Sequence, residues 1–259
     1  MLQQGISLTM NRNYPLAITT LKSLLKEYPN SKFRNEAYYW LGYASSFSAE
    51  LLRKKNQTES INEYKASIKF LTKGNPKSLT QKQKQKRWYL IGNAWWVLDK
   101  ISQAAKAWNN YLKEITFDDP EQALQIKYKL ALRFQKDKKF LESEKWFARI
   151  INEHKKSKLA VESSFWRAEM AYASLLQNNN VIPKKASDRI VKHYNLYLEK
   201  NDEKHRALTF YRIGTLEQNF RPLNSISSFN NYLATKDKIF AIEVKYRLAH
   251  LYINSKNPK

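Results

Sequence analysis

Few residues in this chain suit covalent or metal chemistry. The sequence has no cysteine, which excludes disulfides, thiolate metal sites and thiol nucleophiles. The four histidines are scattered and form no H-E-x-x-H pair: His154, His193, His205 and His250. A metal site needs several converging ligands, so a lone histidine is more often part of the fold. We therefore expect no metal, no cofactor and no catalytic residue.

Aromatic residues recur at one position of the sequence pattern and are stronger candidates for binding. Three residues before each recurring glycine or alanine stands an aromatic side chain: Tyr39, Tyr89, Tyr128, Phe165, Tyr211 and Tyr246. On the same face we expect Tyr43, Asn93, Trp96, Gln135, Tyr172 and Gln218. Rings with amides among them could hold an extended or helical peptide by stacking and by hydrogen bonds to its backbone. The alternative is that the rings only pack the helices together.

Two amphipathic stripes in residues 88–120 predict the helices that position these side chains. The first stripe has spacing i, i+3, i+4, i+7 and consists of Trp88, Ile91, Gly92 and Trp95. The second consists of Ala104, Trp108 and Tyr111. Gly92 and Ala104 are small, which predicts that two antiparallel helices approach closely there. Gly92→Trp should therefore destabilise the protein more than any change on a charged face.

The order of residues in this stretch resembles a tetratricopeptide repeat, W-x2-L-G-x2-Y…A-x3-F…P. Residues 26–44, with YPNS followed by AYYWLG, look like the bacterial envelope branch of that family, which works in outer-membrane assembly, the Tol-Pal system and cell division. The resemblance implies an all-α fold: a right-handed superhelical solenoid of antiparallel helix pairs whose first helices line the concave binding face. It also implies a periplasmic or envelope-associated location, with the cytoplasm as the alternative.

Repeat spacing predicts one tetratricopeptide-like solenoid over residues 1–259. Its approximate repeats are 1–31, 32–84, 85–120, 121–157, 158–202 and 203–238, with a closing helix at 239–255. The second and fifth repeats contain extra residues, which either lengthen both helices or form a longer loop. NNYL occurs at 109–112 and again at 230–233, which favours two tandem blocks of three repeats. Because the first residues look like the inside of a helix, we expect a segment of a longer protein.

The basic charge indicates the kind of partner. Lys+Arg 46 against Asp+Glu 23 gives a net charge of +23 at pH 7. Such a charge could attract an acidic protein, a nucleic acid or an anionic membrane surface. The basic runs, such as 82–87 and 136–139, fall mostly at turns and outer helix faces, away from the aromatic row. No apolar run approaches the roughly 20 residues that span a bilayer.

Enzymatic activity is not expected. Glu142-Ser143 and Glu162-Ser163 resemble the catalytic Glu-Ser of lytic transglycosylases, but both pairs fall within predicted repeat helices. Four of the 5 glycines occupy the small-residue position of the repeat and the fifth, Gly74, is expected to cap a helix, which leaves none for a phosphate-binding loop. We predict a non-enzymatic scaffold that binds a partner protein or peptide, in an envelope machine such as outer-membrane assembly, division or a flagellar motor. The alternative is a solenoid that binds nucleic acid or another polyanion.

Overall fold

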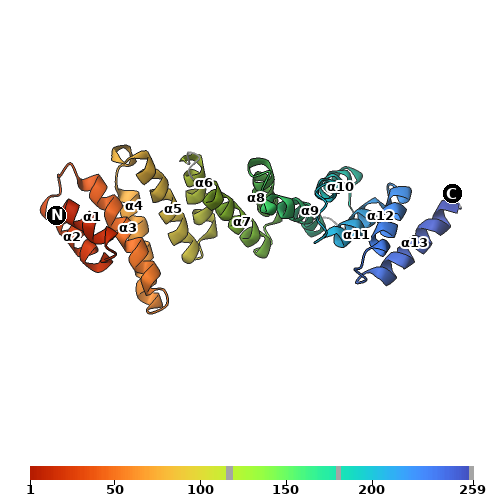
Figure 1. The fold of residues 1–259 in the computed structure, drawn as a ribbon, viewed down its shortest axis with the longest axis horizontal. Helices are drawn as coiled ribbons and strands as arrows, with labels where there is room; N and C mark the ends of the chain where they lie inside the picture. The colour runs from red at the N-terminus through yellow and green to blue at the C-terminus, as the bar shows by residue number, and fades with distance from the viewer. Residues whose placement is uncertain (115–118, 179–181, 257–259) are drawn as a thin grey trace. The chain divides into compact units, whose positions relative to one another are not determined.

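A computed structural model describes residues 1–114, 119–178 and 182–256, and within these ranges the fold is all-α, as predicted (Figure 1). The described residues form thirteen α-helices and one short 3-10 helix, and no strand. Helices dominate because glycine is scarce and apolar residues recur at helical spacing. None of the described helices has the length and apolar character that crossing a lipid bilayer requires.

The chain divides into two compact units, Met1–Pro120 and Glu121–Lys259. Unit 1 contains α1 (Leu2–Met10), α2 (Tyr14–Glu27), α3 (Arg34–Leu52), α4 (Gln57–Lys73), the 3-10 helix η1 (Pro76–Ser78), α5 (Gln81–Val97) and α6 (Ile101–Glu114). The helices after the division are α7 (Pro120–Lys136), α8 (Phe140–Glu153), α9 (Lys158–Asn178), α10 (Lys184–Leu198), α11 (Arg206–Glu217), α12 (Pro222–Ala234) and α13 (Ala241–Lys256). The division, which the single-solenoid prediction did not include, falls between the two predicted blocks of three repeats.

Local chemistry fixes where α5 begins. Thr80 and Gln83 form a capping box, in which the Thr80 hydroxyl accepts from the Gln83 N–H (3.2 Å) and the Gln83 side chain accepts from the Thr80 N–H (2.9 Å). The polar stretch 78–86 therefore opens a helix and is no linker. The boundary predicted between residues 84 and 85 consequently lies inside α5.

The extra residues of the second repeat lengthen its helices, α3 to 19 residues and α4 to 17. Ser67 of α4 donates its hydroxyl to the Gly42 carbonyl (2.7 Å). The Tyr64 hydroxyl, one turn earlier on α4, donates to Glu50 in the lengthened part of α3. In the fifth repeat α9 reaches 21 residues, and residues 179–181 of its extension lie outside the described residues.

Small residues let the two helices of a pair approach closely, as the pattern predicted. A Cβ built on Gly92 would overlap the indole ring of Trp108, with Cγ 2.7 Å away. A Cβ on Gly214 would lie 2.5 Å from Cε1 of Phe229. Each contact is well inside the normal carbon–carbon separation of about 3.5–4.0 Å. These helix pairs therefore require glycine at that position.

Serine hydroxyls reinforce the same contacts in both units. Besides Ser67, Ser225 donates to the Gly214 carbonyl (2.7 Å), and Ser143 donates to the Ala131 carbonyl (2.8 Å). Buried clusters then join one helix pair to the next, so the core is distributed along each unit. This arrangement places the first helix of each pair next to the first helix of its neighbour in unit 1, where α3 contacts both α1 and α5.

Candidate binding surface

We call the surface formed by α1, α3 and α5 the unit 1 face. Tyr39, Tyr43 and Phe47 lie along one side of α3 because residues four apart in a helix are neighbours on its surface. The ring centroids of Tyr39 and Tyr43 are 6.2 Å apart, and those of Tyr43 and Phe47 are stacked at 4.7 Å. Tyr14 of α2 stacks on Phe47 at 5.9 Å. The unit 1 face is therefore built around a continuous aromatic strip.

Four of the five predicted binding residues in unit 1 remain partly accessible. Tyr39 is buried, whereas Tyr43 and, from α5, Tyr89, Asn93 and Trp96 are half-buried. The hydroxyls of Tyr43 and Tyr89 and the amide of Asn93 form no hydrogen bond to another residue that the structure describes. These groups satisfy their hydrogen bonds only with water or with a partner.

The Tyr43 hydroxyl of the strip is uncharged, and the cation Lys86 lies beside Tyr89. Burial, with a smaller contribution from Tyr14, raises the pKa of Tyr43, so its hydroxyl stays protonated and can donate. Lys86 places its Nζ 4.9 Å from the ring centroid of Tyr89. Burial lowers the pKa of Lys86, although Asp119 opposes the shift. The face therefore combines aromatic area, free hydrogen-bonding groups and a partly desolvated lysine.

In unit 2 two residues of the predicted aromatic row, Phe165 and Tyr211, are covered by other rings. Phe165 is buried, and the His205 imidazole stacks on it with centroids 4.0 Å apart and an interplanar angle of 9°. Tyr211 is buried too, and Phe240 stacks on it at 4.2 Å and 11°. Burial, followed by the charge of Lys204, lowers the pKa of His205, which favours the neutral ring that stacks. These two row positions therefore serve packing.

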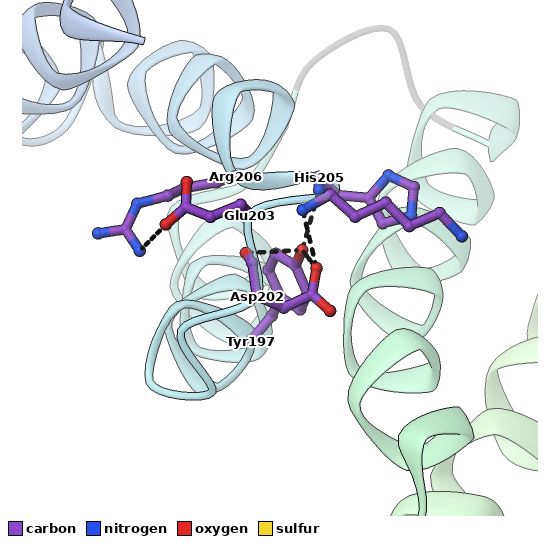
Figure 2. A network of polar contacts seen from close by, with 6 residues as sticks. Tyr197, Asp202, Glu203, His205 and Arg206 are labelled. Carbon is purple, nitrogen blue, oxygen red and sulfur yellow. Dashed lines mark hydrogen bonds and ion pairs between the residues drawn. The ribbon is translucent and has the colours of Figure 1, made fainter.

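Figure 2 shows the polar contacts that hold the linker after α10, which carries the His205 imidazole, in place. The Tyr197 hydroxyl donates to the Asp202 carboxylate (2.8 Å) and accepts from the His205 N–H (2.9 Å). Glu203 and Arg206 form an ion pair at 3.1 Å beside this network. One phenol thus fixes the turn that carries His205 onto Phe165.

The same device recurs after α12. The Phe240 N–H donates to the Tyr232 hydroxyl (2.7 Å), and that hydroxyl also contacts the Asp237 carboxylate (3.4 Å). Tyr232, Asp237 and Phe240 each lie 35 positions after the corresponding residues of the first network, Tyr197, Asp202 and His205. The spacing Y-x4-D-x2-[H/F] therefore occurs twice in the sequence. This signal was available in the sequence and our sequence interpretation missed it.

Polar contacts engage most other predicted residues of unit 2. The Arg212 guanidinium lies 4.7 Å from the Tyr172 ring centroid. The Tyr211 hydroxyl donates to Glu243 (3.0 Å), and Arg247 donates to the Gln218 side chain (2.6 Å). These contacts form a ladder between neighbouring first helices.

Two further members of the predicted set sit beside that ladder. Tyr128 is half-buried and is hydrogen-bonded to Glu162, and burial is the main cause of its raised pKa, to which the Glu162 charge and hydrogen bond add. Gln135 is half-buried, and its side-chain amide forms no hydrogen bond within the described residues. Gln135 thus keeps an unused polar side chain.

Tyr246 lies on an exposed side of α13. Its side chain is 66% exposed, and its ring packs edge-on against His250 at 4.6 Å. Tyr246 and Gln218 line one hollow of about 500 Å³ between α11 and α13. The structure thus brings these two predicted residues together, with Arg247 beside them.

The titratable residues that could suggest catalysis are used in packing. Ser143 and Ser163 are both fully buried. His193 packs near Glu144, with 3.8 Å between its Nε2 and the carboxylate, but Arg167 and Arg189 also pair with that carboxylate. Burial, then the charges of Arg167, Arg189 and Lys192, lowers the His193 pKa to about 4. Among the residues described, no group of three His, Asp or Glu side chains is placed to hold a metal ion.

One of the basic runs also contributes to the fold. Arg87 is buried and donates to the Leu71 carbonyl, and burial lowers its pKa. Its guanidinium lies 4.9 Å from the Trp88 ring centroid. Arg87 is therefore removed from the solvent-exposed charge that could contact a phosphate backbone.

No protein-family model and no curated protein matches this sequence. Among solved structures, BtubC (BKLC) from P. vanneervenii is similar at 14% identity and a TM-score of 0.42, over 100% of this chain and 94% of that one. A tetratricopeptide repeat protein from Parabacteroides merdae is similar at 12% identity and a TM-score of 0.40, over 97% of each chain. The yeast Sti1 TPR2AB domain, in its complex with pHSP90, is similar at 13% identity and a TM-score of 0.35, over 98% of this chain and 96% of that one.

Proposed function

We propose that this protein is a non-enzymatic, tetratricopeptide-like scaffold and that its unit 1 face binds a partner protein or peptide. The main support is the contrast between residues of the unit 1 face and their counterparts in and just after α11. Tyr43, Tyr89 and Asn93 leave hydrogen-bonding groups unused on an aromatic surface, whereas Tyr211 and Gln218 in unit 2 are bonded internally. Aromatic rings supply contact area, and free amides and hydroxyls can satisfy a peptide backbone.

The partner we propose is acidic. The chain carries a net charge of +23, which would speed the encounter with an acidic surface. Lys86 beside Tyr89 offers a cation at the face itself, where an opposite charge would be less screened than in bulk water. We expect association to slow as the salt concentration rises, while the aromatic contacts persist.

We place this scaffold in a bacterial envelope machine, such as outer-membrane assembly, division or a flagellar motor. The support is the resemblance of residues 26–44 to the envelope branch of the repeat family. Fractionation of the native cell would test the location. Recovery of the protein with the periplasmic fraction is the expected result, and recovery only with cytoplasmic markers would contradict it.

The binding proposal is tested by capture from native extract at physiological salt, with and without nuclease, followed by affinity measurements with the captured partner. The test variant Tyr43→Phe/Asn93→Ala removes one hydroxyl and one amide from the unit 1 face. The control Tyr28→Phe/Asn62→Ala removes the same groups from exposed positions outside it. Each hydrogen bond contributes about 0.5–1.5 kcal/mol, so loss of two should weaken binding roughly 5- to 150-fold.

Each result decides between the hypotheses. Weakening by the test variant alone supports the unit 1 face. Equal affinity of the two variants would contradict that assignment. Loss of all captured material on nuclease treatment would favour the nucleic-acid alternative, in which the logarithm of the association constant should fall linearly with the logarithm of the salt concentration.

A further inference from the structure

A second surface of unit 1 has the character of an anion site. A hollow of about 660 Å³ opens where the turn between α2 and α3 meets the C-terminal end of α4. Three cations line it, Lys32, Arg34 and Lys73, and no aspartate or glutamate does. None of the three forms an ion pair with another residue that the structure describes. The hollow therefore carries concentrated and uncompensated positive charge.

Tyr38 lines the hollow, and two of the three cations lie close to its ring. The Lys73 Nζ lies 5.1 Å from its ring centroid, and the Arg34 guanidinium lies 5.7 Å from it. Burial acts to raise the pKa of Tyr38, but hydrogen bonds to Lys73 and Arg34, together with their charges, outweigh burial and lower it. The surroundings thus favour a negative charge at the phenol, and they would favour one on a ligand.

Three neutral side chains that line the hollow keep unused hydrogen-bond donors. Ser31 uses its oxygen to accept from the Phe33 N–H (3.2 Å), which leaves its O–H proton. Asn35 accepts from the Asn75 N–H (3.0 Å), and Asn75 accepts from a third backbone N–H, so both amides keep their NH2 groups. A site that offers cations and donors, and in which the Asn35 and Asn75 amide oxygens are already hydrogen-bonded, favours an anion rich in acceptor oxygens.

The fold keeps these groups together through Gly74. A Cβ at Gly74 would lie 3.1 Å from the Asn35 carbonyl oxygen and 3.3 Å from the Tyr38 Cβ. The end of α4 therefore approaches the start of α3 closely enough to bring Lys73 to Tyr38. The Asn35–Asn75 hydrogen bond joins the same two segments.

We infer that the hollow lined by Lys32, Arg34 and Lys73 binds a phosphate monoester group. A phosphate monoester carries about −1.5 to −2 charges at pH 7 and three acceptor oxygens, which fits three cations and several neutral donors better than a single carboxylate does. Arg34 supplies the forked guanidinium that bonds to phosphate in a bidentate manner. The hollow exceeds the phosphate group itself, which leaves space for the group that carries it. The site contains none of the residues proposed above to bind a protein partner, so either proposal can fail alone.

The test is calorimetric titration of the full chain with inorganic phosphate, phenyl phosphate and acetate. Lys73→Met removes one lining cation, and Lys69→Met removes an equal charge one turn earlier on the exposed side of the same helix. We expect saturable binding of both phosphates, weakened about tenfold by Lys73→Met and changed less than about twofold by Lys69→Met, where tenfold corresponds to about 1.4 kcal/mol. Arg34→Gln should weaken it similarly, and circular dichroism confirms that each variant is folded.

The remaining outcomes overturn the inference. Absence of saturable phosphate binding, equal weakening by the two lysine variants, or acetate binding as tight as phenyl phosphate binding would each contradict a phosphate site. Vesicles containing phosphatidic acid separate the two sources of a monoester. Vesicle binding that depends on Lys73 indicates a lipid headgroup in this site, and binding independent of Lys73 in the absence of phenyl phosphate binding indicates charge attraction alone.

Discussion

Replacement of Gly92 by alanine should destabilise unit 1, although the same change at an ordinary helix position stabilises. Gly92 lies within α5, where alanine is favoured over glycine by up to about 1 kcal/mol. The added methyl group, however, would overlap the indole of Trp108, which is 1% exposed and has little room to move. Steric conflict and helix propensity therefore act in opposite directions at this residue.

The magnitude follows from the size of the overlap. Cγ of Trp108 would lie 2.7 Å from the new methyl carbon, about 1 Å inside a normal contact. Overpacking of a well-packed core costs about 1–3 kcal/mol, which exceeds the gain in propensity. We expect a net loss of about 1–2 kcal/mol and a decrease in Tm of several degrees, since 1 kcal/mol shifts Tm by about 2–8 °C depending on the size of the unfolding unit. Gly92→Trp should be worse still.

The measurement is thermal and urea unfolding of wild type, Gly92→Ala, Trp108→Leu and the double variant. Trp108→Leu alone should destabilise, but it makes room for the methyl group, so the second change should cost less in its presence. The exposed Lys106→Ala on α6 serves as a control for an ordinary helix change. A higher Tm for Gly92→Ala than for wild type would refute the close approach at this contact.

Two further predictions concern unit 2. Tyr197→Phe should lower the free energy of unfolding by about 1–3 kcal/mol, because the partly buried His205 N–H loses its acceptor; unchanged urea unfolding would contradict this. The depressed His193 pKa, about 4 against 6.5 in the unfolded chain, means that only the unfolded chain gains a proton as the pH first falls. Its contribution is complete above pH 6.5 and is lost between pH 6.5 and 4, up to about 3 kcal/mol; His193→Gln should unfold with a shallower pH dependence over this range, and an unchanged dependence would show that other groups dominate.

The sequence was sufficient to predict the helix pairs because the constraint that creates them is local and steric. A close approach of two backbones demands a side chain no larger than Gly or Ala, and Gly92 and Gly214 sit where such a contact occurs. The positions of the extra residues could also be predicted from the sequence. Their conformation could not be predicted, because the length of α3 and α4 there depends on burial of residues such as Ala49 against neighbouring helices.

Which of the proposed binding residues are accessible could not be predicted, because accessibility depends on what covers a ring from elsewhere in the chain. Phe165 and Tyr211 occupy the same position of the repeat pattern as Tyr89, yet they are buried under His205 and Phe240. Those covering residues lie in linkers, at positions to which the helical pattern assigns no face. Only the Y-x4-D-x2-[H/F] spacing marks them, and its meaning becomes visible once the turn is seen.

The covering rings suggest which positions on this scaffold are free to recognise a partner. Leu79 shares a buried cluster with Tyr39 just before α5, as His205 and Phe240 cover their row residues just before α11 and α13. The row position is therefore largely committed to joining one helix pair to the next, and it tolerates aromatic residues for that reason. The positions four residues later lie one helical turn further along the same helix face. In unit 1 these positions do not join one helix pair to the next: Tyr43 and Asn93 are half-buried, and their polar groups are free. Selectivity for a partner would then reside in this second row, so exchanging its residues should alter binding while the helix pairing stays intact.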